Sequence, residues 1–447
     1  CREGRKDMRG IEAALECRRE VRRGAFASEV LRKMGGAVEA PERTLASSLL
    51  YAVSRKESLW KHLLGLFLRK PLHTLSSETA DALLVGAAGL VELRHFSPSV
   101  LVSALVGQVK AGKSPYDAAL VNAVLRRVAQ EGPGILEKIA RSADVRDQCL
   151  VHGIPSWAGR RWIEDWGKEE ARRLWKLSSM KPLMSLRLNT AEGRDSFLET
   201  LAGAGFRAWA SPLLGNGVRL SSNPFPPSLP GYAEGSATPQ TESAMIAAES
   251  FLALAAEGPL LEMCSGRGVK TGHFLSRLPG GVPLESWEIG PGRVASARAE
   301  MDRIKLGGRA SFKTGDALHL EPGEKPRGIF LDAPCSGSGT WKRHPEAKWK
   351  LTPEKLDQMA ELQLRLLERA FGLVQPGGVV VYCTCSLFRQ ENEQVVGRAL
   401  ASGGDLVELP LDLPRKVSVK GKPYGRVVLP LLPWVDGFYI AAFMKRP

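Results

Sequence analysis

Short apolar runs alternate with longer helical segments from about residue 235 to the end of the chain, and this pattern constrains the fold most. The runs have the length of buried strands, and the segments between them repeat apolar residues at helical spacing. Such alternation predicts a mostly parallel sheet with helices on both faces. We expect strands at Leu260–Cys264, Leu284–Ile289, Ile329–Asp332, Val379–Cys385 and Phe438–Met444, and helices at Pro291–Lys305 and Pro353–Val374.

The first 145 residues follow a different pattern, in which apolar residues recur at helical spacing throughout. The next stretch is mixed, because Met184–Asn189 and Gly217–Leu220 favour strands, Asp195–Ala204 favours a helix, and prolines between residues 224 and 230 mark a linker. We therefore predict an all-helical domain at 1–145, a small α+β connecting domain with a Pro-rich linker at 146–235, and an α/β domain at 236–447.

The chain of 447 residues carries a formal net charge of +14, and its isoelectric point is about 9.5. This basic excess favours a polyanionic partner, most commonly nucleic acid, although the same charge could serve solubility alone. No apolar stretch approaches the ~18 residues that cross a bilayer, and the charged residues 1–9 contain no signal region. We expect a cytoplasmic monomer that does not bind a membrane.

The seven cysteines are scattered and none forms a C-x-x-C pair, so we expect reduced thiols and no metal site. Two of them have distinctive settings: Cys335 follows one predicted strand in the sequence Asp-Ala-Pro-Cys-Ser, and Cys385 ends another in Thr-Cys-Ser. A single cysteine is more often a small buried hydrophobe than a nucleophile. Two cysteines at one edge of a sheet, beside Asp332, favour the reactive interpretation.

Ligands of parallel α/β sheets bind at the carboxyl ends of the strands. Cys264 ends the first strand there and opens a loop whose glycines allow a ligand to approach the backbone closely, formed by Ser265, Gly266, Arg267, Gly268, Val269 and Lys270. The loop lacks the glycine before the lysine of a P-loop and the third glycine of a dinucleotide fingerprint. Glu288 ends the second strand, where a carboxylate can bind ribose hydroxyls, and Asp316 follows the third strand.

Further motifs occur across the chain, namely Val121–Arg127, Pro155–Trp157, Arg343–Glu346 with Lys348-Trp349, Glu391–Glu393 and Asp436–Phe438. Together with the two cysteine motifs, they resemble the Sun family of RNA cytosine-carbon-5 methyltransferases, and within it the bacterial enzymes that act on 16S ribosomal RNA. The resemblance covers nearly the whole chain. It implies that the helical region is a NusB-like RNA-binding domain, and that the C-terminal region is a Rossmann-like domain with S-adenosylmethionine as cofactor.

Carbon 5 of cytosine is a poor nucleophile, and attack of a thiolate on carbon 6 makes it reactive. By the resemblance, Cys385 attacks and Cys335 assists release. Asp332 would contact the cofactor and hold the cytosine at nitrogen 3, where charge develops. The resemblance also places the methionine part of the cofactor at Cys264–Lys270, the ribose at Glu288 and the adenine at Asp316.

For some other residues both a functional and a purely structural interpretation remain open. Arg293 could steady Glu288 or be an ordinary surface arginine, and the pairs Arg126-Arg127 and Arg160-Arg161 could contact phosphates or form solvated faces. His344 and Lys348-Trp349 are expected to shape the target pocket, with a solvated loop as the alternative.

The cofactor loop departs from the family pattern, which has Pro and Gly at positions 267 and 269, and Thr241 stands where the family has Asp. These changes leave open a catalytically impaired RNA-binding protein as an alternative to the enzyme. A second alternative is the same chemistry on transfer RNA.

Overall fold

The computed structural model describes residues 2–34, 38–93, 97–112, 114–190, 193–255, 257–403, 405–421 and 423–447, and of residues 2–8 and 420 it describes the backbone alone. The chain forms two compact units. The helical unit comprises Cys1–Ser179 and Trp341–Leu351, and the sheet unit comprises Met180–Thr340 and Thr352–Pro447. The units thus divide at residue 179, later than the boundary of 145 that we expected, because α8 packs on both α7 and α9 and continues the helical unit. The division into three domains stays a prediction.

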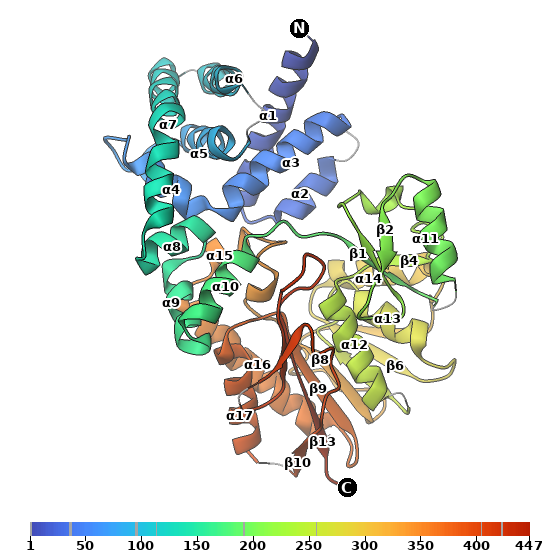
Figure 1. Ribbon diagram of the computed structural model, residues 1–447. Coiled ribbons are helices and arrows are strands. Elements are labelled where there is room, and N and C mark those ends of the chain that lie inside the picture. Colours follow the sequence, from blue (N-terminus) through green and yellow to red (C-terminus); the bar gives the residue numbers. More distant parts are fainter. Residues whose placement is uncertain are drawn as a thin grey trace. The chain divides into compact units, whose positions relative to one another are not determined.

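The helical unit consists of helices throughout its described residues, as the periodicity predicts (Figure 1). Its helices are α1 (Arg2–Arg22), α2 (Ala27–Lys33), α3 (Ala40–Arg55), α4 (Glu57–Gly65), α5 (Ser77–Glu92), α6 (Pro98–Ala111), α7 (Pro115–Arg141), α8 (Val145–His152), α9 (Ser156–Trp166), α10 (Lys168–Ser178) and α15 (Ala347–Lys350).

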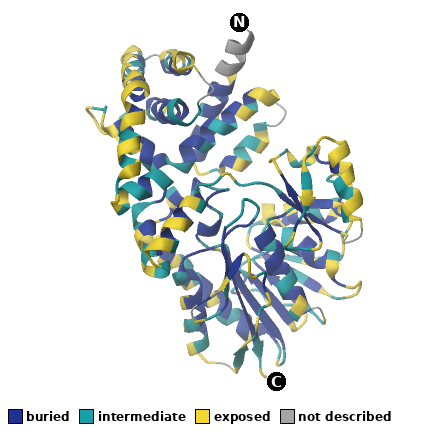
Figure 2. Ribbon diagram, in the orientation of Figure 1, coloured by how far each residue is buried: buried dark blue, intermediate teal, exposed yellow. Residues whose placement is uncertain are grey.

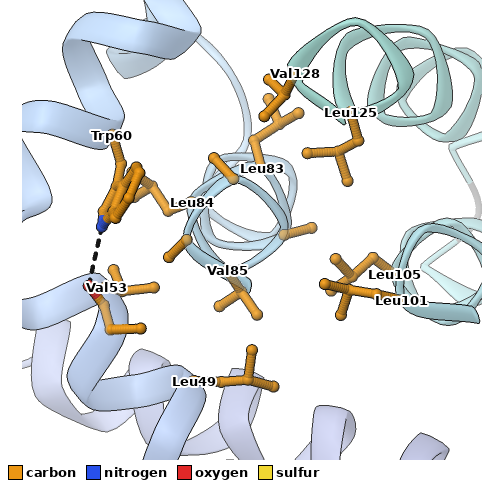
Figure 3. Packing of buried hydrophobic residues seen from close by; sticks show 14 of the residues in the cluster. Leu49, Val53, Trp60, Leu83, Leu84, Val85, Leu101, Leu105, Leu125 and Val128 are labelled. Atoms are coloured by element: carbon orange, nitrogen blue, oxygen red, sulfur yellow. Dashed lines mark hydrogen bonds between the residues drawn. The ribbon is translucent and has the colours of Figure 1, made fainter. Parts of the chain in front are cut away.

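Helix α5 forms the centre of this unit, with leucine and valine side chains of its neighbours around it (Figure 3). Two glycines make this close packing possible. A Cβ atom at Gly86 would lie 2.5 Å from Leu125, and one at Gly89 would lie 2.6 Å from Leu101. The indole of Trp60, also in this core, donates a hydrogen bond to the carbonyl of Ala52 at 2.9 Å. A larger side chain at either glycine would therefore push a core leucine out of place.

The segment 341–351 belongs to the helical unit although it is distant from it in sequence. Trp341 stacks on Trp162 with ring centroids 5.3 Å apart. Further along, a Glu346 carboxylate oxygen accepts a hydrogen bond from the backbone N–H of Ala27 at 3.0 Å. The segment is thus held at both ends by residues of the N-terminal helices.

The sheet unit begins with a small antiparallel sheet of strand order β2-β3-β1-β4. Apolar residues on one face of this sheet pack around α11 (Arg194–Gly203). On the other face Arg187 and Arg219 are buried, and Arg219 forms two hydrogen bonds of 2.7 Å with Glu242. The strands are β1 (Ser185–Leu188), β2 (Ala208–Ala210), β3 (Gly217–Leu220) and β4 (Ala237–Pro239).

The second sheet of this unit has the order β11-β12-β13-β9-β8-β5-β6-β7, and β10 pairs with β13. Strands β5 to β9 run parallel, and β13 runs antiparallel to β9. The strands are β5 (Leu260–Met263), β6 (Leu284–Glu288), β7 (Ala310–Thr314), β8 (Gly328–Asp332), β9 (Val379–Thr384), β10 (Leu406–Glu408), β11 (Ser418–Lys420), β12 (Arg426–Val428) and β13 (Phe438–Lys445). The chain moves one way from β5 to β7 and the other way from β8 to β9. The switch point where α/β sheets bind ligands therefore lies between β5 and β8.

Helices cover both faces of this sheet, which confirms the predicted fold class. One face packs against α12 (Glu242–Leu254), α13 (Val269–Arg277) and α14 (Pro291–Arg303), and the other against α16 (Pro353–Leu373) and α17 (Glu393–Ala401) (Figure 1). The central strands are buried, as the dark blue of β8 and β9 shows in Figure 2. Over the described part of the chain, no helix is long and apolar enough to span a bilayer.

Candidate active site

The loop after β5 turns sharply into α13 at the switch point. Cys264 has a φ of 62°, which few residues other than glycine adopt, and Gly266 and Gly268 have φ values of 61° and 76°. A Cβ atom at Gly268 would lie 2.8 Å from the Cβ atom of Ala297 on α14. Glycine is therefore required at 268 by both its φ and this contact.

Two residues that depart from the family pattern, Val269 and Thr241, occupy positions whose backbone accommodates them. Val269 is the first residue of α13 and its φ is not positive, so this position does not need the family's glycine. Thr241 occupies the N-cap of α12, and its hydroxyl accepts a hydrogen bond from the backbone N–H of Ala244, as an aspartate would. The altered loop keeps a geometry suited to ligand binding.

Glu288 lies at the end of β6, as expected. Its Oε2 accepts a hydrogen bond from the backbone N–H of Gly266 at 2.9 Å, and its Oε1 accepts one from that of Gly290 at 2.8 Å. Arg293 forms an ion pair with Oε1 at 2.6 Å, so the interpretation of Arg293 as a support for Glu288 agrees with the geometry. The Oε2 atom, which has one donor, retains an acceptor site for a ligand.

The carboxylates at the strand ends surround Cys264. Burial, followed by Asp332, Glu288 and Asp316, raises the pKa of the Cys264 thiol to about 12. Asp316 is 44% exposed at its side chain, and its Oδ1 accepts a hydrogen bond from the backbone of Leu318 at 3.0 Å. The three carboxylates thus converge on one thiol that stays protonated at neutral pH.

Asp332 ends β8 and pairs with Lys270 of the loop helix. The Lys270 Nζ atom lies 2.5 Å from Oδ2 of Asp332 and 5.5 Å from the ring centre of Phe438. Burial would lower the pKa of Lys270, but Asp332 outweighs that effect and the pKa is raised. The other oxygen of Asp332 accepts a hydrogen bond from the Cys383 thiol at 3.5 Å. Lys270 therefore remains charged beside Asp332.

The two cysteines with distinctive motifs come together. Cys335 follows β8 and Cys385 follows β9, and their Sγ atoms are 3.3 Å apart. Both thiols are partly exposed, whereas Cys17, Cys149 and Cys383 are buried. The hydrogen bond with Cys385 and burial raise the pKa of Cys335 well above that of an ordinary thiol. A protonated Cys335 can donate a hydrogen bond to a Cys385 thiolate.

Glu391, a buried carboxylate of the motif Glu391–Glu393, is bonded to Ser336, the residue after Cys335. Its Oε1 accepts hydrogen bonds from the backbone N–H of Ser336 at 2.8 Å and from the Gln363 amide at 2.9 Å, and its Oε2 accepts one from the Ser336 hydroxyl. The Ser336 hydroxyl also lies 3.2 Å from that of Ser386. The motif Glu-Asn-Glu was visible in the sequence, but which residues it contacts could not be read from it.

The motif residues of segment 341–351 contact the helical unit. Lys348 is fully buried and the Trp349 indole donates a hydrogen bond to the carbonyl of Ser54 at 2.6 Å, so the alternative of a solvated loop is wrong for these two residues. His344 makes an edge-to-face contact with Phe26. Their role in a target pocket stays a prediction. In the described residues no group of His, Cys, Asp and Glu side chains has the arrangement of a metal site.

Models of three known protein families match regions of this chain. The family model of 16S rRNA methyltransferase RsmB/F matches residues 249–444, the NusB family matches residues 11–130, and the ferredoxin-like domain of RsmF/B-like methyltransferases matches residues 154–225. The last match spans α9 and α10 of the helical unit and strands β1 to β3 of the sheet unit.

Relatives match over the whole length. The ribosomal RNA small subunit methyltransferase B of Pseudomonas putida is 30% identical over 414 residues, covering 91% of this chain and 92% of the relative. The protein of the same name from Klebsiella pneumoniae is 29% identical, with 97% of both chains covered. The crystal structure of PH0851 has the same fold, with a TM-score of 0.85 over 98% of this chain and 99% of that chain at 21% identity. The predicted family is confirmed, and the chain belongs to the 16S rRNA methyltransferase RsmB/F family, whose cofactor is S-adenosylmethionine.

Proposed function

We propose that this protein transfers a methyl group to carbon 5 of a cytidine in 16S ribosomal RNA through a covalent bond between Cys385 and the cytosine. One observation carries the proposal, the contact of 3.3 Å between the Sγ atoms of Cys335 and Cys385. Cysteines that serve packing alone are generally buried, whereas these two are partly exposed and come from the ends of different strands.

The residues at the switch point fit S-adenosylmethionine. Ser265 has a buried hydroxyl with no hydrogen-bond partner among the described residues, in a loop whose backbone a ligand can approach. The loop Cys264–Lys270 would hold the methionine part, Glu288 the ribose hydroxyls through Oε2, and Asp316 the adenine. When bound, the cofactor supplies an electrophilic methyl group.

The first step is attack of the Cys385 thiolate on carbon 6 of the cytosine. The bond from Sγ to carbon 6 forms, and the electron pair of the double bond between carbons 5 and 6 moves into the ring, where nitrogen 3 takes up a proton from solvent. The Asp332 carboxylate accepts a hydrogen bond from this N3–H and stabilises the charge that develops. Lys270 forms an ion pair with Asp332 and holds its side chain in place for this task.

Carbon 5 then takes the methyl group with the electron pair that the attack has provided. Release requires loss of the remaining proton on carbon 5. Cys335, after giving its own proton to solvent, takes the carbon 5 proton as the double bond re-forms and the bond to the Cys385 Sγ breaks. Nitrogen 3 then returns its proton to solvent, which leaves neutral 5-methylcytosine. The raised pKa of Cys335 supports this order, because a thiol of high pKa is protonated during attack and is a strong base once deprotonated.

The name of the relatives, ribosomal RNA small subunit methyltransferase B, supports 16S ribosomal RNA as substrate, and the NusB match supports an RNA-binding helical region. The basic charge of the chain suits either ribosomal or transfer RNA.

The test uses purified protein with isotope-labelled cofactor and either a 16S ribosomal RNA transcript or transfer RNA, followed by digestion and mass spectrometry of the nucleosides. We expect 5-methylcytidine from 16S ribosomal RNA, and none with Cys385→Ala. A different methylated nucleoside would refute the carbon 5 chemistry, and product from transfer RNA alone would refute the substrate. Cofactor binding by calorimetry without methylation of either RNA would favour the impaired RNA-binding protein.

A further inference from the structure

The proposed reaction gives no role to Glu391, a fully buried carboxylate bonded to the residue after Cys335. We propose that Glu391 is a positioning residue that holds the loop of Cys335 in place for release and contributes little to the attack by Cys385. This inference rests on the proposed function, since it presupposes that the two cysteines act in separate steps.

Most hydrogen bonds of Glu391 fall on the Cys335 side of the site, and the exception is one with the side chain of Ser386, which follows Cys385. The two oxygens of Glu391 accept hydrogen bonds from the N–H and the hydroxyl of Ser336, the residue directly after Cys335. Gln363, which donates to Glu391, also donates to the carbonyl of Pro334, the residue directly before Cys335, at 2.8 Å. Glu391 and Gln363 thus fix the backbone on both sides of Cys335.

Other groups hold Cys385. Thr384 belongs to β9, whose register pairs it with Tyr439 of β13. The side chain of Asn392 accepts a hydrogen bond from the Thr384 hydroxyl at 2.6 Å and donates one to the carbonyl of Ser386 at 3.0 Å. The carbonyl of Cys385 itself accepts a hydrogen bond from the backbone N–H of Gly339 at 2.9 Å. Loss of the Glu391 carboxylate therefore loosens Cys335 more than Cys385.

Only a carboxylate can accept from all the donors around Glu391. Its neighbours present a backbone N–H, a hydroxyl and an amide N–H, so both oxygens are needed as acceptors. Burial raises the pKa of Glu391, and the hydrogen bonds from Ser336, Ser386 and Gln363 oppose that effect. In Glu391→Gln, one acceptor oxygen becomes an NH₂ group that faces these donors, and at least one bond to Ser336 or Gln363 is lost.

The expected result for Glu391→Gln is a selective defect in release. Attack and methyl transfer proceed while Cys335 is displaced, so kcat falls about 10- to 100-fold, as small misplacements of reacting groups do. The KM for RNA falls together with kcat, because the covalent complex builds up before the slowed step. An enzyme–RNA adduct that survives denaturing electrophoresis therefore accumulates, as in Cys335→Ala. A residue that merely supports the fold would lower product without accumulating adduct.

Glu393→Gln is the matched control, because Glu393 is a buried carboxylate two residues away that pairs with Arg389 at 3.8 Å. It should turn over normally and form no adduct. If Glu391→Gln does not fold by circular dichroism, Ser336→Ala, which removes one hydroxyl and keeps the carboxylate, should show a smaller accumulation of adduct. Adduct from Cys335→Ala but from neither Glu391→Gln nor Ser336→Ala would overturn the inference. Absence of adduct from Cys335→Ala would instead overturn the proposed function.

Discussion

Two fully buried charged side chains, Glu391 in the sheet unit and Lys348 in the helical unit, have opposite surroundings. Hydrogen bonds reach both oxygens of the Glu391 carboxylate. The Lys348 ammonium has no hydrogen-bond partner among the described residues and lies 5.1 Å from the ring centre of Trp349. Burial, followed by Arg55 and Lys56, lowers the pKa of Lys348 to about 7. The hydrogen bonds of the first group hold the backbone next to Cys335, whereas the second group is buried without a hydrogen bond, which is expected to cost stability.

Replacement of both residues by methionine should change stability in opposite directions, and the larger effect is expected at Glu391. Glu391→Met leaves the Ser336 N–H and one N–H of the Gln363 amide buried without an acceptor, which costs about 3–5 kcal/mol of unfolding free energy. Chemical denaturation measures this loss. An unchanged unfolding free energy would show that the hydrogen bonds around Glu391 contribute little to stability. The contrast between Glu391 and Lys348 would then not hold for Glu391.

Glu288 differs from both residues, because its carboxylate supports the loop after β5 and is also expected to bind the cofactor. Glu288→Ala removes hydrogen bonds to ligand hydroxyls, each worth about 1.5–3 kcal/mol, so cofactor affinity measured by calorimetry should fall at least about tenfold. Arg293→Ala, which removes the support and keeps the carboxylate, should reduce affinity less. Equal affinities of Glu288→Ala and the unmodified protein would remove Glu288 from the cofactor site.

Lys348→Met should raise the unfolding free energy of the helical unit by about 1–3 kcal/mol, because an apolar side chain of similar volume replaces an unpaired buried charge. The control is Lys350→Met, two residues along, where the side chain is exposed and a change within about 0.5 kcal/mol is expected. A loss of stability in Lys348→Met would mean that the ammonium makes a favourable interaction in solution.

The last prediction concerns how the unfolding free energy depends on pH. The pKa of Lys348 is about 7 in the folded chain and about 10.4 in the unfolded chain. Between these values the unfolded state binds one more proton, so stability rises with pH, and below pH 7 both states are charged and Lys348 adds no dependence. The gap in unfolding free energy between Lys348→Met and the unmodified protein should therefore narrow from pH 7 to pH 9. If the unfolding free energies of the two proteins changed in parallel with pH, the lowered pKa of Lys348 would be contradicted.

The sequence predicts the elements of the large sheet well because their signal is local. The expected strands at Leu260–Cys264 and Val379–Cys385 each differ from the observed strands, β5 and β9, by one residue. The sequence also places Cys335 and Cys385 at one sheet edge, since parallel strands end together. It could not give their Sγ contact, because 50 residues separate them and the loops after the strands set the distance.

The contacts of Glu391 and the burial of Lys348 were beyond the sequence for a similar reason. Glu391 is bonded to Ser336 across 55 positions, and the Lys348 segment is held by α2 and α3, more than 290 positions away. Composition favours an exposed position for a glutamate and a lysine, so tertiary contacts alone decide their burial. The helical unit likewise continues past residue 145, because the packing of α8 against α7 and α9 has no sequence signal of its own.

The central claim is that Cys385 attacks and Cys335 releases, and one denaturing gel tests it most directly. Cys335→Ala and Cys385→Ala are incubated with the cofactor and radiolabelled 16S ribosomal RNA. We predict a stable protein–RNA adduct from Cys335→Ala, and neither adduct nor product from Cys385→Ala. An adduct from Cys385→Ala alone would reverse the two roles, and normal turnover by both variants would contradict covalent catalysis.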